Sequence, residues 1–142
     1  MKTVKQIDLL LKNEPGSLSA VSDLLGLNGI NIIAFYVVTE GDEGRLHFVS
    51  NDPDKAINVL RTAGYTLEIK EVIACETPHH AGGLNAVLKP LKAANINVDY
   101  VYPCIGTGEI TVLILGVGPV KKSLEILDDN WIRVLGSELY HI

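Results

Sequence analysis

The sequence predicts an α+β protein built from two copies of one small module, and three observations support this fold class. Residues of matching type recur 66 positions apart, as Gly16 and Leu18 do with Gly82 and Leu84. Short β-prone runs alternate with segments in which apolar residues follow a helical period. Each half of the chain has the same order of expected elements, strand, helix, strand, strand, helix and strand.

The first copy begins with a strand, a turn and a helix. Val4–Leu11 is apolar and β-prone, which predicts the strand, and the turn residues Asn13-Glu14-Pro15-Gly16 follow it. Apolar side chains then recur at helical spacing, and Gly29 is placed to end that helix. The residues of this stripe are Leu18, Val21, Leu24 and Leu25.

A hairpin, a second helix and a fourth strand complete the first copy. The two hairpin strands are expected over Asn31–Thr39 and Leu46–Ser50. Asp52 is placed to cap a helix that starts with Pro53 and ends at Gly64. Thr66–Lys70 is the last expected strand. The order βαββαβ is the ferredoxin-like arrangement, with an antiparallel sheet covered by two helices.

The second copy repeats this order, which predicts two domains over residues 1–71 and 72–142. Further anchors of the repeat are Ile30-Asn31 with Ile96-Asn97, Pro53 with Pro119, and Leu60 with Ile126. The last residues, Glu138–Ile142, align with a strand and are expected to form one. The expected elements of this copy are strands Val72–Glu76, Val98–Tyr102, Glu109–Leu115 and Ile132–Leu135, and helices Gly83–Ala94 and Val120–Asp128.

The strands carry apolar residues on both faces, although helices cover only one face of such a sheet. A half-exposed antiparallel sheet normally alternates apolar with polar residues. The second face is therefore expected to be buried by another sheet or another subunit, which favours a homodimer. Simple alternation places Ile32, Ala34, Tyr36 and Val38 on one face, and Ile33, Phe35 and Val37 on the other.

Composition excludes several classes of function. Apolar residues make up 47% of the chain, and the net charge is −5 with a pI of about 5.3, so a globular acidic protein is expected. Nucleic-acid binding is not expected, because no cluster of Lys and Arg is present. No apolar run is long enough to span a membrane. The run Ile7–Leu11 is short and carries Asp8, so no signal peptide is predicted, and Cys75 and Cys104 are expected to be reduced thiols in the cytoplasm.

The segment Lys12-Asn13-Glu14-Pro15-Gly16-Ser17-Leu18 is the strongest candidate for a ligand site. A helix N-terminus presents N–H groups and the positive end of the helix dipole, which suit a carboxylate. Gly16 allows close approach to the backbone, and the Asn13 amide both donates and accepts hydrogen bonds. An α-amino acid, with its carboxylate and ammonium, requires both kinds of partner. The alternative is an ordinary turn that starts a helix.

This segment and the repeat together resemble the ACT domain family, most clearly the ACT domain of phosphoglycerate dehydrogenase. The pattern N-x-P-G-x-L followed by G-[IV]-N-I stands here as Asn13 to Leu18 and Gly29-Ile30-Asn31-Ile32. In that family, amino-acid effectors bind between two paired domains. The resemblance implies that Asn13 binds from one domain and Asn31 from its partner. The chain is also similar to stand-alone tandem ACT proteins that carry no enzyme.

The second copy departs from the family pattern in the corner that runs from Thr77 to Leu84. His79 stands in place of Asn13, and Ala81 in place of Pro15. This corner either binds differently or serves only as the surface that faces the first. The candidate residues that it adds are His79, His80, Gly82, Gly83, Leu84 and Asn97.

No metal or cofactor is predicted. Adjacent histidines in an extended segment point apart, so His79 and His80 are poor joint ligands. A metal site would require folding to gather them with His47, Cys75 and Cys104. Tyr100 and Tyr102 are expected to pack on the sheet or, alternatively, to line a pocket.

The sequence also lacks the motifs of common catalytic sites. It has no Gly-x-Ser-x-Gly, no phosphate-binding loop and no Cys-x-x-Cys. We therefore expect a non-catalytic sensor that binds an amino acid and acts on an enzyme or regulator of amino-acid metabolism. The alternative is a protein–protein interaction module that has lost ligand binding.

Overall fold

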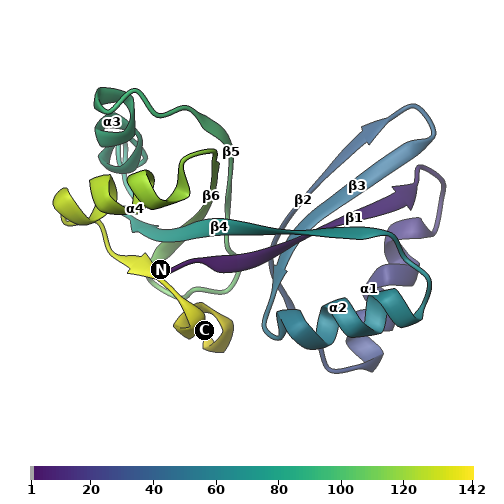
Figure 1. Cartoon of the computed structure of the whole chain (residues 1–142). Helices are drawn as coiled ribbons and strands as arrows, with labels where there is room; N and C mark the ends of the chain where they lie inside the picture. The colour runs from purple at the N-terminus through teal and green to yellow at the C-terminus, as the bar shows by residue number, and fades with distance from the viewer. Residues whose placement is uncertain (1) are drawn as a thin grey trace. The chain divides into compact units, whose positions relative to one another are not determined.

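The computed structural model describes residues 2–142 and contains two compact units (Figure 1). The first unit comprises Lys5–Lys70. The second comprises residues 71–142 with the N-terminal residues up to Val4. Strand β4 begins in the first unit and ends in the second. The elements are β1 Val4–Lys12, α1 Ser17–Leu27, β2 Ile32–Glu40, β3 Glu43–Ser50, α2 Pro53–Thr62, β4 Leu67–Thr77, α3 Asn85–Ala93, β5 Val98–Pro103, β6 Thr111–Val117, α4 Val120–Asp129, β7 Val134–Leu135 and the 3₁₀ helix η1 Ser137–His141.

The first unit has the predicted βαββαβ order. Its strands lie in the order β2-β3-β1-β4, and the pairs β1–β3 and β2–β3 are antiparallel. Asp52 caps α2 as predicted, because its side chain accepts a hydrogen bond from the Lys55 N–H, and Pro53 is the first helical residue. The α+β fold class expected from the sequence is therefore confirmed.

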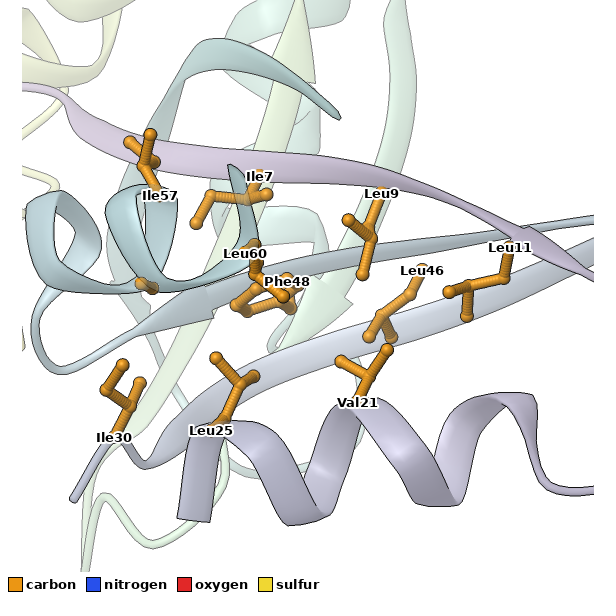
Figure 2. Packing of buried hydrophobic residues seen from close by; sticks show 11 residues of the cluster. Ile7, Leu9, Leu11, Val21, Leu25, Ile30, Leu46, Phe48, Ile57 and Leu60 are labelled. Carbon is orange, nitrogen blue, oxygen red and sulfur yellow. The ribbon is translucent and has the colours of Figure 1, made fainter. Parts of the chain in front are cut away.

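Helices α1 and α2 cover one face of this sheet and close the core of the unit (Figure 2). The helices contribute Val21 and Leu25 from α1 and Leu60 from α2, against Phe48 at the centre of the sheet. Each fully buried side chain of this size contributes about 1.5–3 kcal/mol of transfer free energy. The buried side chains of this cluster are Ile7, Leu9, Leu11, Val21, Leu25, Ile30, Leu46, Phe48, Ala56, Ile57 and Leu60.

The second unit repeats this plan with strand order β5-β6-β4-β7. Helices α3 and α4 supply Val87, Leu91 and Leu127 to its core. The equivalent first hydrogen bonds of α2 and α4 run from Ala56 N to Asp52 O and from Ser123 N to Pro119 O. Pro119 therefore takes the place of Asp52, and the repeat offset at α4 is 67 and not 66. The counterparts of Pro53 and Leu60 are therefore Val120 and Leu127, and the predicted matches to Pro119 and Ile126 are each wrong by one residue.

The expected strand over Glu138–Ile142 is wrong. Ser137–His141 forms a 3₁₀ helix, in which Leu139 N donates to Gly136 O and Leu139 is buried. The repeat aligned this segment with Val72–Glu76, which belongs to β4 and pairs with β6 and β7. A strand requires such partners, whereas this segment forms local hydrogen bonds, as Ile142 N does with Leu139 O.

Several other boundaries differ from expectation, and two of the differences have a local cause. The strands predicted over Thr66–Lys70 and Val72–Glu76 are one continuous strand, β4, because no turn residue separates them. Helix α3 begins at Asn85 and not at Gly83, because the preceding residues form turns in which Asn85 N donates to Gly82 O.

A bulge in β2 changes the predicted division of its faces. Ile32 pairs with Ser50 but Ala34 pairs with Val49, so the register shifts between them. Neighbours on β3 point to opposite faces, and Ile32 therefore lies on the helix side, where it packs on the core. The prediction that Ile32 and Ala34 share a face is wrong. A bulge adds one residue to a strand without leaving a period-2 signal in the sequence.

Candidate functional site

The first corner joins the end of β1 to the start of α1, and the neighbouring hairpin turn holds it in place. Asn13 N donates to Asp42 O at 2.8 Å, and the Asn13 side-chain Nδ2 donates to Gly41 O at 2.9 Å. An amide side chain has two N–H donors and an acceptor oxygen, so this bond engages only part of its capacity. The hairpin thereby fixes the direction in which the Asn13 amide points.

The N-terminus of α1 is open. Gly16 adopts a left-handed backbone with φ of 89°, and a Cβ at this position would meet nothing within 4 Å. Within residues 2–142, no side chain caps the helix, and its first turn carries no acidic residue. The positive end of the helix dipole is therefore exposed at this corner.

A hollow of about 650 Å³ lies at this corner, within the size range of small-molecule sites. Five residues of the predicted segment line it, Lys12, Glu14, Pro15, Gly16 and Ser17, whereas Asn13 and Leu18 are not in its lining. Tyr65 and Thr66 contribute from the segment before β4, and Asp42 from the hairpin turn. With Glu43 also in its lining, the hollow combines a cationic side chain, three carboxylates and a helix N-terminus.

Asn31 and Ile32 lie at the other end of the same sheet. Strand β2 meets β3 at Ile32 and Ser50 at one end, and at Glu40 and Glu43 beside the corner at the other. The Asn31 N–H donates to Asn51 Oδ1 at 2.9 Å. Within the first unit, the structure therefore does not bring Asn31 close to Asn13.

The second corner is built differently and is closed by its own hydrogen bonds. Thr77 Oγ1 donates to Gly83 O at 3.0 Å, and Gly83 N donates to His80 O at 2.9 Å. A Cβ at Gly83 would lie 2.1 Å from the backbone oxygen of Pro78, so only glycine fits there. His79 and His80 are exposed, and His80 Nδ1 lies 2.9 Å from Ala81 O.

The remaining predicted residues of the second unit flank this corner. Gly82 has a left-handed backbone with φ of 80°, and Leu84 is the half-exposed residue that precedes α3. Asn97 precedes β5, and its Nδ2 donates to Asp99 Oδ1 at 3.0 Å. The Asn97 amide is thus bonded to a carboxylate two residues later. The first copy has no such partner, because the residue two positions after Asn31 is Ile33.

Comparison with known proteins decides the family, since residues 2–140 match the model of the ACT domain pair. The chain belongs to the ACT domain pair family. The protein BT0572 from Bacteroides thetaiotaomicron is similar over 99% of this chain and 98% of its own, with 27% identity and a TM-score of 0.92. The regulatory subunit of aspartate kinase from Thermus thermophilus shares the fold over 92% of this chain and 93% of its own, with 13% identity and a TM-score of 0.64. A search of curated proteins finds no match.

The ACT domain pair holds no grouping of three metal-ligating side chains among its described residues. Cys75 is buried in the core of the second unit and Cys104 is half-buried, and neither forms a disulfide. Burial raises the pKa of each thiol to about 12, so both are protonated at neutral pH. No helix within residues 2–142 has the length and hydropathy needed to cross a bilayer.

The two tyrosines singled out in the sequence lie on the second unit's sheet. Tyr100 and Tyr102 stack with ring centroids 6.4 Å apart. The Tyr100 ring lies over Gly116, where a Cβ would be 2.1 Å from it. Tyr102 is buried, so both rings are packed on the sheet as expected.

The structure also reveals a polar cluster on the first sheet that the sequence analysis missed. Asp8 Oδ1 lies 2.7 Å from both Gln6 Nε2 and His47 Nδ1, and Asp8 Oδ2 pairs with Lys70 Nζ at 2.9 Å. Tyr36 stacks on His47 with ring centroids 4.4 Å apart. Gln6 and Asp8 lie on the face opposite α1 and α2, because their β1 neighbours Ile7 and Leu9 belong to the core.

The electrostatics of this cluster follow from its contacts. Burial alone raises the pKa of the Asp8 carboxyl, but hydrogen bonds from Lys70, His47 and Gln6 outweigh it, and the net pKa is below its ordinary value. Asp8 is therefore ionised at neutral pH although its side chain is only 3% exposed. The signal in the sequence was the period-2 pair Gln6 and Asp8 within an apolar strand.

Proposed function

We propose that this ACT domain pair binds a free α-amino acid at its first corner and regulates a partner enzyme or regulator of amino-acid metabolism, without catalysing a reaction itself. The observation that carries the proposal is the uncapped N-terminus of α1, which opens on a hollow of about 650 Å³. A carboxylate is the ligand group that such a site stabilises best, because the helix dipole and its N–H groups act together.

The other groups at the corner suit the rest of an amino acid. Glu14 and Asp42 line the hollow and offer carboxylates to an ammonium group. The Asn13 amide, oriented by Gly41, has a remaining donor and an acceptor for the backbone of the ligand. Gly16 leaves the approach to the helix N-terminus unobstructed.

The second Asn of the family pattern motivates a homodimer. Asn31 of the same unit lies at the far end of the sheet and does not reach Asn13. We therefore propose that a facing ACT domain of a second chain supplies Asn31 to the site. We also propose that the two domains divide between residues 71 and 72. A location in the cytoplasm is proposed because both cysteines are free thiols.

The aspartate kinase regulatory subunit, similar in fold, supports a regulatory role by analogy. A second candidate function is an interaction module that has lost ligand binding. It is favoured by the second corner, whose backbone groups are bonded to one another and whose histidines face solvent.

Isothermal titration with a panel of the standard amino acids tests the proposal. We expect one class of amino acid to bind the wild-type chain, and Asn13→Ala to weaken that binding about ten- to a hundred-fold, which is about 1.5–3 kcal/mol for a charge-assisted contact. Asn130→Ala is the matched control, because it removes an amide that is also exposed and that donates to a backbone oxygen at 2.8 Å. If no amino acid binds at millimolar concentration, the interaction module takes the place of the sensor.

A further inference from the structure

The four α-helices within residues 2–142 end in the same turn, but one of the four turns is made with an unusual residue. The second residue after each helix has a left-handed backbone, with φ of 69° at Gly29, 89° at Gly64, 58° at Asn95 and 61° at Trp131. In each turn the next residue donates its N–H to a carbonyl of the last helical turn, as Ile132 N does to Leu127 O at 3.0 Å. Glycine and asparagine tolerate this conformation, whereas a tryptophan is disfavoured there.

The Trp131 side chain does not contribute to the core. It is 96% exposed, although tryptophan is the residue that gains most from burial. It is also the only tryptophan in the chain. Neither the backbone nor the packing of the second unit therefore explains its presence.

The charges around Trp131 are also unfavourable for the helix that precedes it. Helix α4 ends in Asp128 and Asp129, and its last turn carries no basic residue. Carboxylates at the negative end of a helix dipole destabilise the helix. The corresponding turn of the first unit has the favourable arrangement, because α2 carries Arg61 in its last turn and Gly64 in the left-handed position.

These features meet at one shallow hollow of about 500 Å³, lined by Asp128, Asp129, Trp131, Ile132 and Arg133. The one cation in this lining is engaged elsewhere, since Arg133 Nη1 pairs with Glu76 Oε2 on β4 at 3.1 Å. Lys2 and Lys121 line a neighbouring hollow that shares Asp128 but includes neither Asp129 nor Trp131. The Trp131 corner thus presents an aromatic face, two carboxylates and the carbonyl end of a helix, all of which attract a cation.

We propose that the Trp131 corner, defined as Asp128, Asp129 and Trp131, is a docking point for an arginine side chain of a partner protein. A planar guanidinium can stack on the indole face and at the same time form paired hydrogen bonds with a carboxylate. A lysine ammonium offers neither the plane nor the fork.

The occupant is a protein and not a free amino acid. A small ligand on an indole this exposed would be covered on one side only, and solvated carboxylates contribute little by themselves, so such a ligand would gain too few contacts to stay bound. Exposed tryptophans and the arginines that meet them are typical anchors of protein interfaces. The inference is independent of amino-acid binding at the first corner, because it uses only residues of the second unit.

Trp131 reports directly on this proposal, because its fluorescence is the only tryptophan signal of the full chain. The probe is a capped, dye-labelled peptide with two arginines separated by glycine, compared with the same peptide carrying lysines and with free arginine. We expect the arginine peptide to change the Trp131 emission in a saturable way and to bind about tenfold more tightly than the lysine peptide.

Variants separate this site from general attraction to an acidic protein. Peptide anisotropy should show binding weakened about tenfold by Trp131→Gly and by the pair Asp128→Asn and Asp129→Asn. The pair Glu68→Gln and Glu71→Gln removes the same net charge from exposed residues and should leave binding unchanged. Trp131→Gly should also raise the melting temperature, because glycine suits the left-handed backbone.

Four outcomes would overturn the proposal. These are no binding of the arginine peptide to the wild-type chain at millimolar concentration, equal binding to Trp131→Gly, equal loss of binding in the charge-matched control, and binding of free arginine as tight as that of the peptide. A fall in the melting temperature of Trp131→Gly would also count against it, since it would give Trp131 a structural role.

Discussion

Replacement of Asp8 by Asn should destabilise the protein markedly, although the two side chains have nearly the same shape. The Asp8 carboxylate receives hydrogen bonds from Gln6, His47 and Lys70 at 2.7 to 2.9 Å and is 3% exposed. The Asn amide keeps one acceptor oxygen for Gln6 and His47, but its NH₂ group then faces the Lys70 ammonium, which is also a donor.

The magnitude follows from the exposure of the partners. Loss of one partner of a fully buried ion pair costs about 3–5 kcal/mol. Lys70 is 48% exposed and can turn to solvent, so the cost here should be smaller, about 2 kcal/mol. For a chain of this length, that corresponds to a fall in melting temperature of roughly 4–8 °C.

The stability difference between wild type and Asp8→Asn should depend on pH, in a direction set by the lowered pKa of Asp8. Because the folded-state pKa of Asp8 is below its ordinary value of 3.8, the contribution of its charge to stability is fully present above that value and is lost as pH falls through the lower folded pKa. Urea unfolding should therefore separate wild type from Asp8→Asn near neutral pH, and the gap should close in acid.

Asp54→Asn is the matched control. It makes the same chemical change in a carboxylate that pairs with Lys5 at 2.8 Å but is 80% exposed. A surface pair contributes up to about 1 kcal/mol, so this variant should lose much less stability. Equal losses in the two variants, or a gap for Asp8→Asn that persists unchanged in acid, would refute the argument.

Two further predictions concern the corners and the thiols. Gly16→Ala should cost about 1–2 kcal/mol, because φ of 89° disfavours any Cβ although the space around it is open. Gly83→Ala should cost more, about 3 kcal/mol, because its Cβ would clash with Pro78 O. Thermal unfolding of both variants tests this order, and a larger loss of stability in Gly16→Ala than in Gly83→Ala would contradict it. Cys75 and Cys104 should react slowly with a disulfide reagent at neutral pH in the folded protein and fully in urea, since burial raises each thiol pKa to about 12; fast reaction of the folded protein would contradict this.

Much of the fold could be predicted from the sequence because its signals are local. The internal repeat and the alternation of strand and helix patterns indicate βαββαβ units, and Asp52 and Pro53 mark a helix start through chemistry that a few residues complete alone. The turn before α1 and the helix N-terminus behind it were likewise predictable from the motif Asn13 to Leu18, whereas the left-handed backbone of Gly16 was seen only in the structure.

The sequence by itself thus determined the repeated topology, the positions of most helices and strands, and the location of the first corner. Only the tertiary structure decided the features that depend on residues far apart in the chain. Asn13 is oriented by Gly41, Asp8 is ionised through His47 and Lys70, and Ser137–His141 forms a 3₁₀ helix in which Leu139 is buried. Hydrogen-bond partners and burial are set by which segments pack together, and neither leaves a periodic signal in the residues that share them.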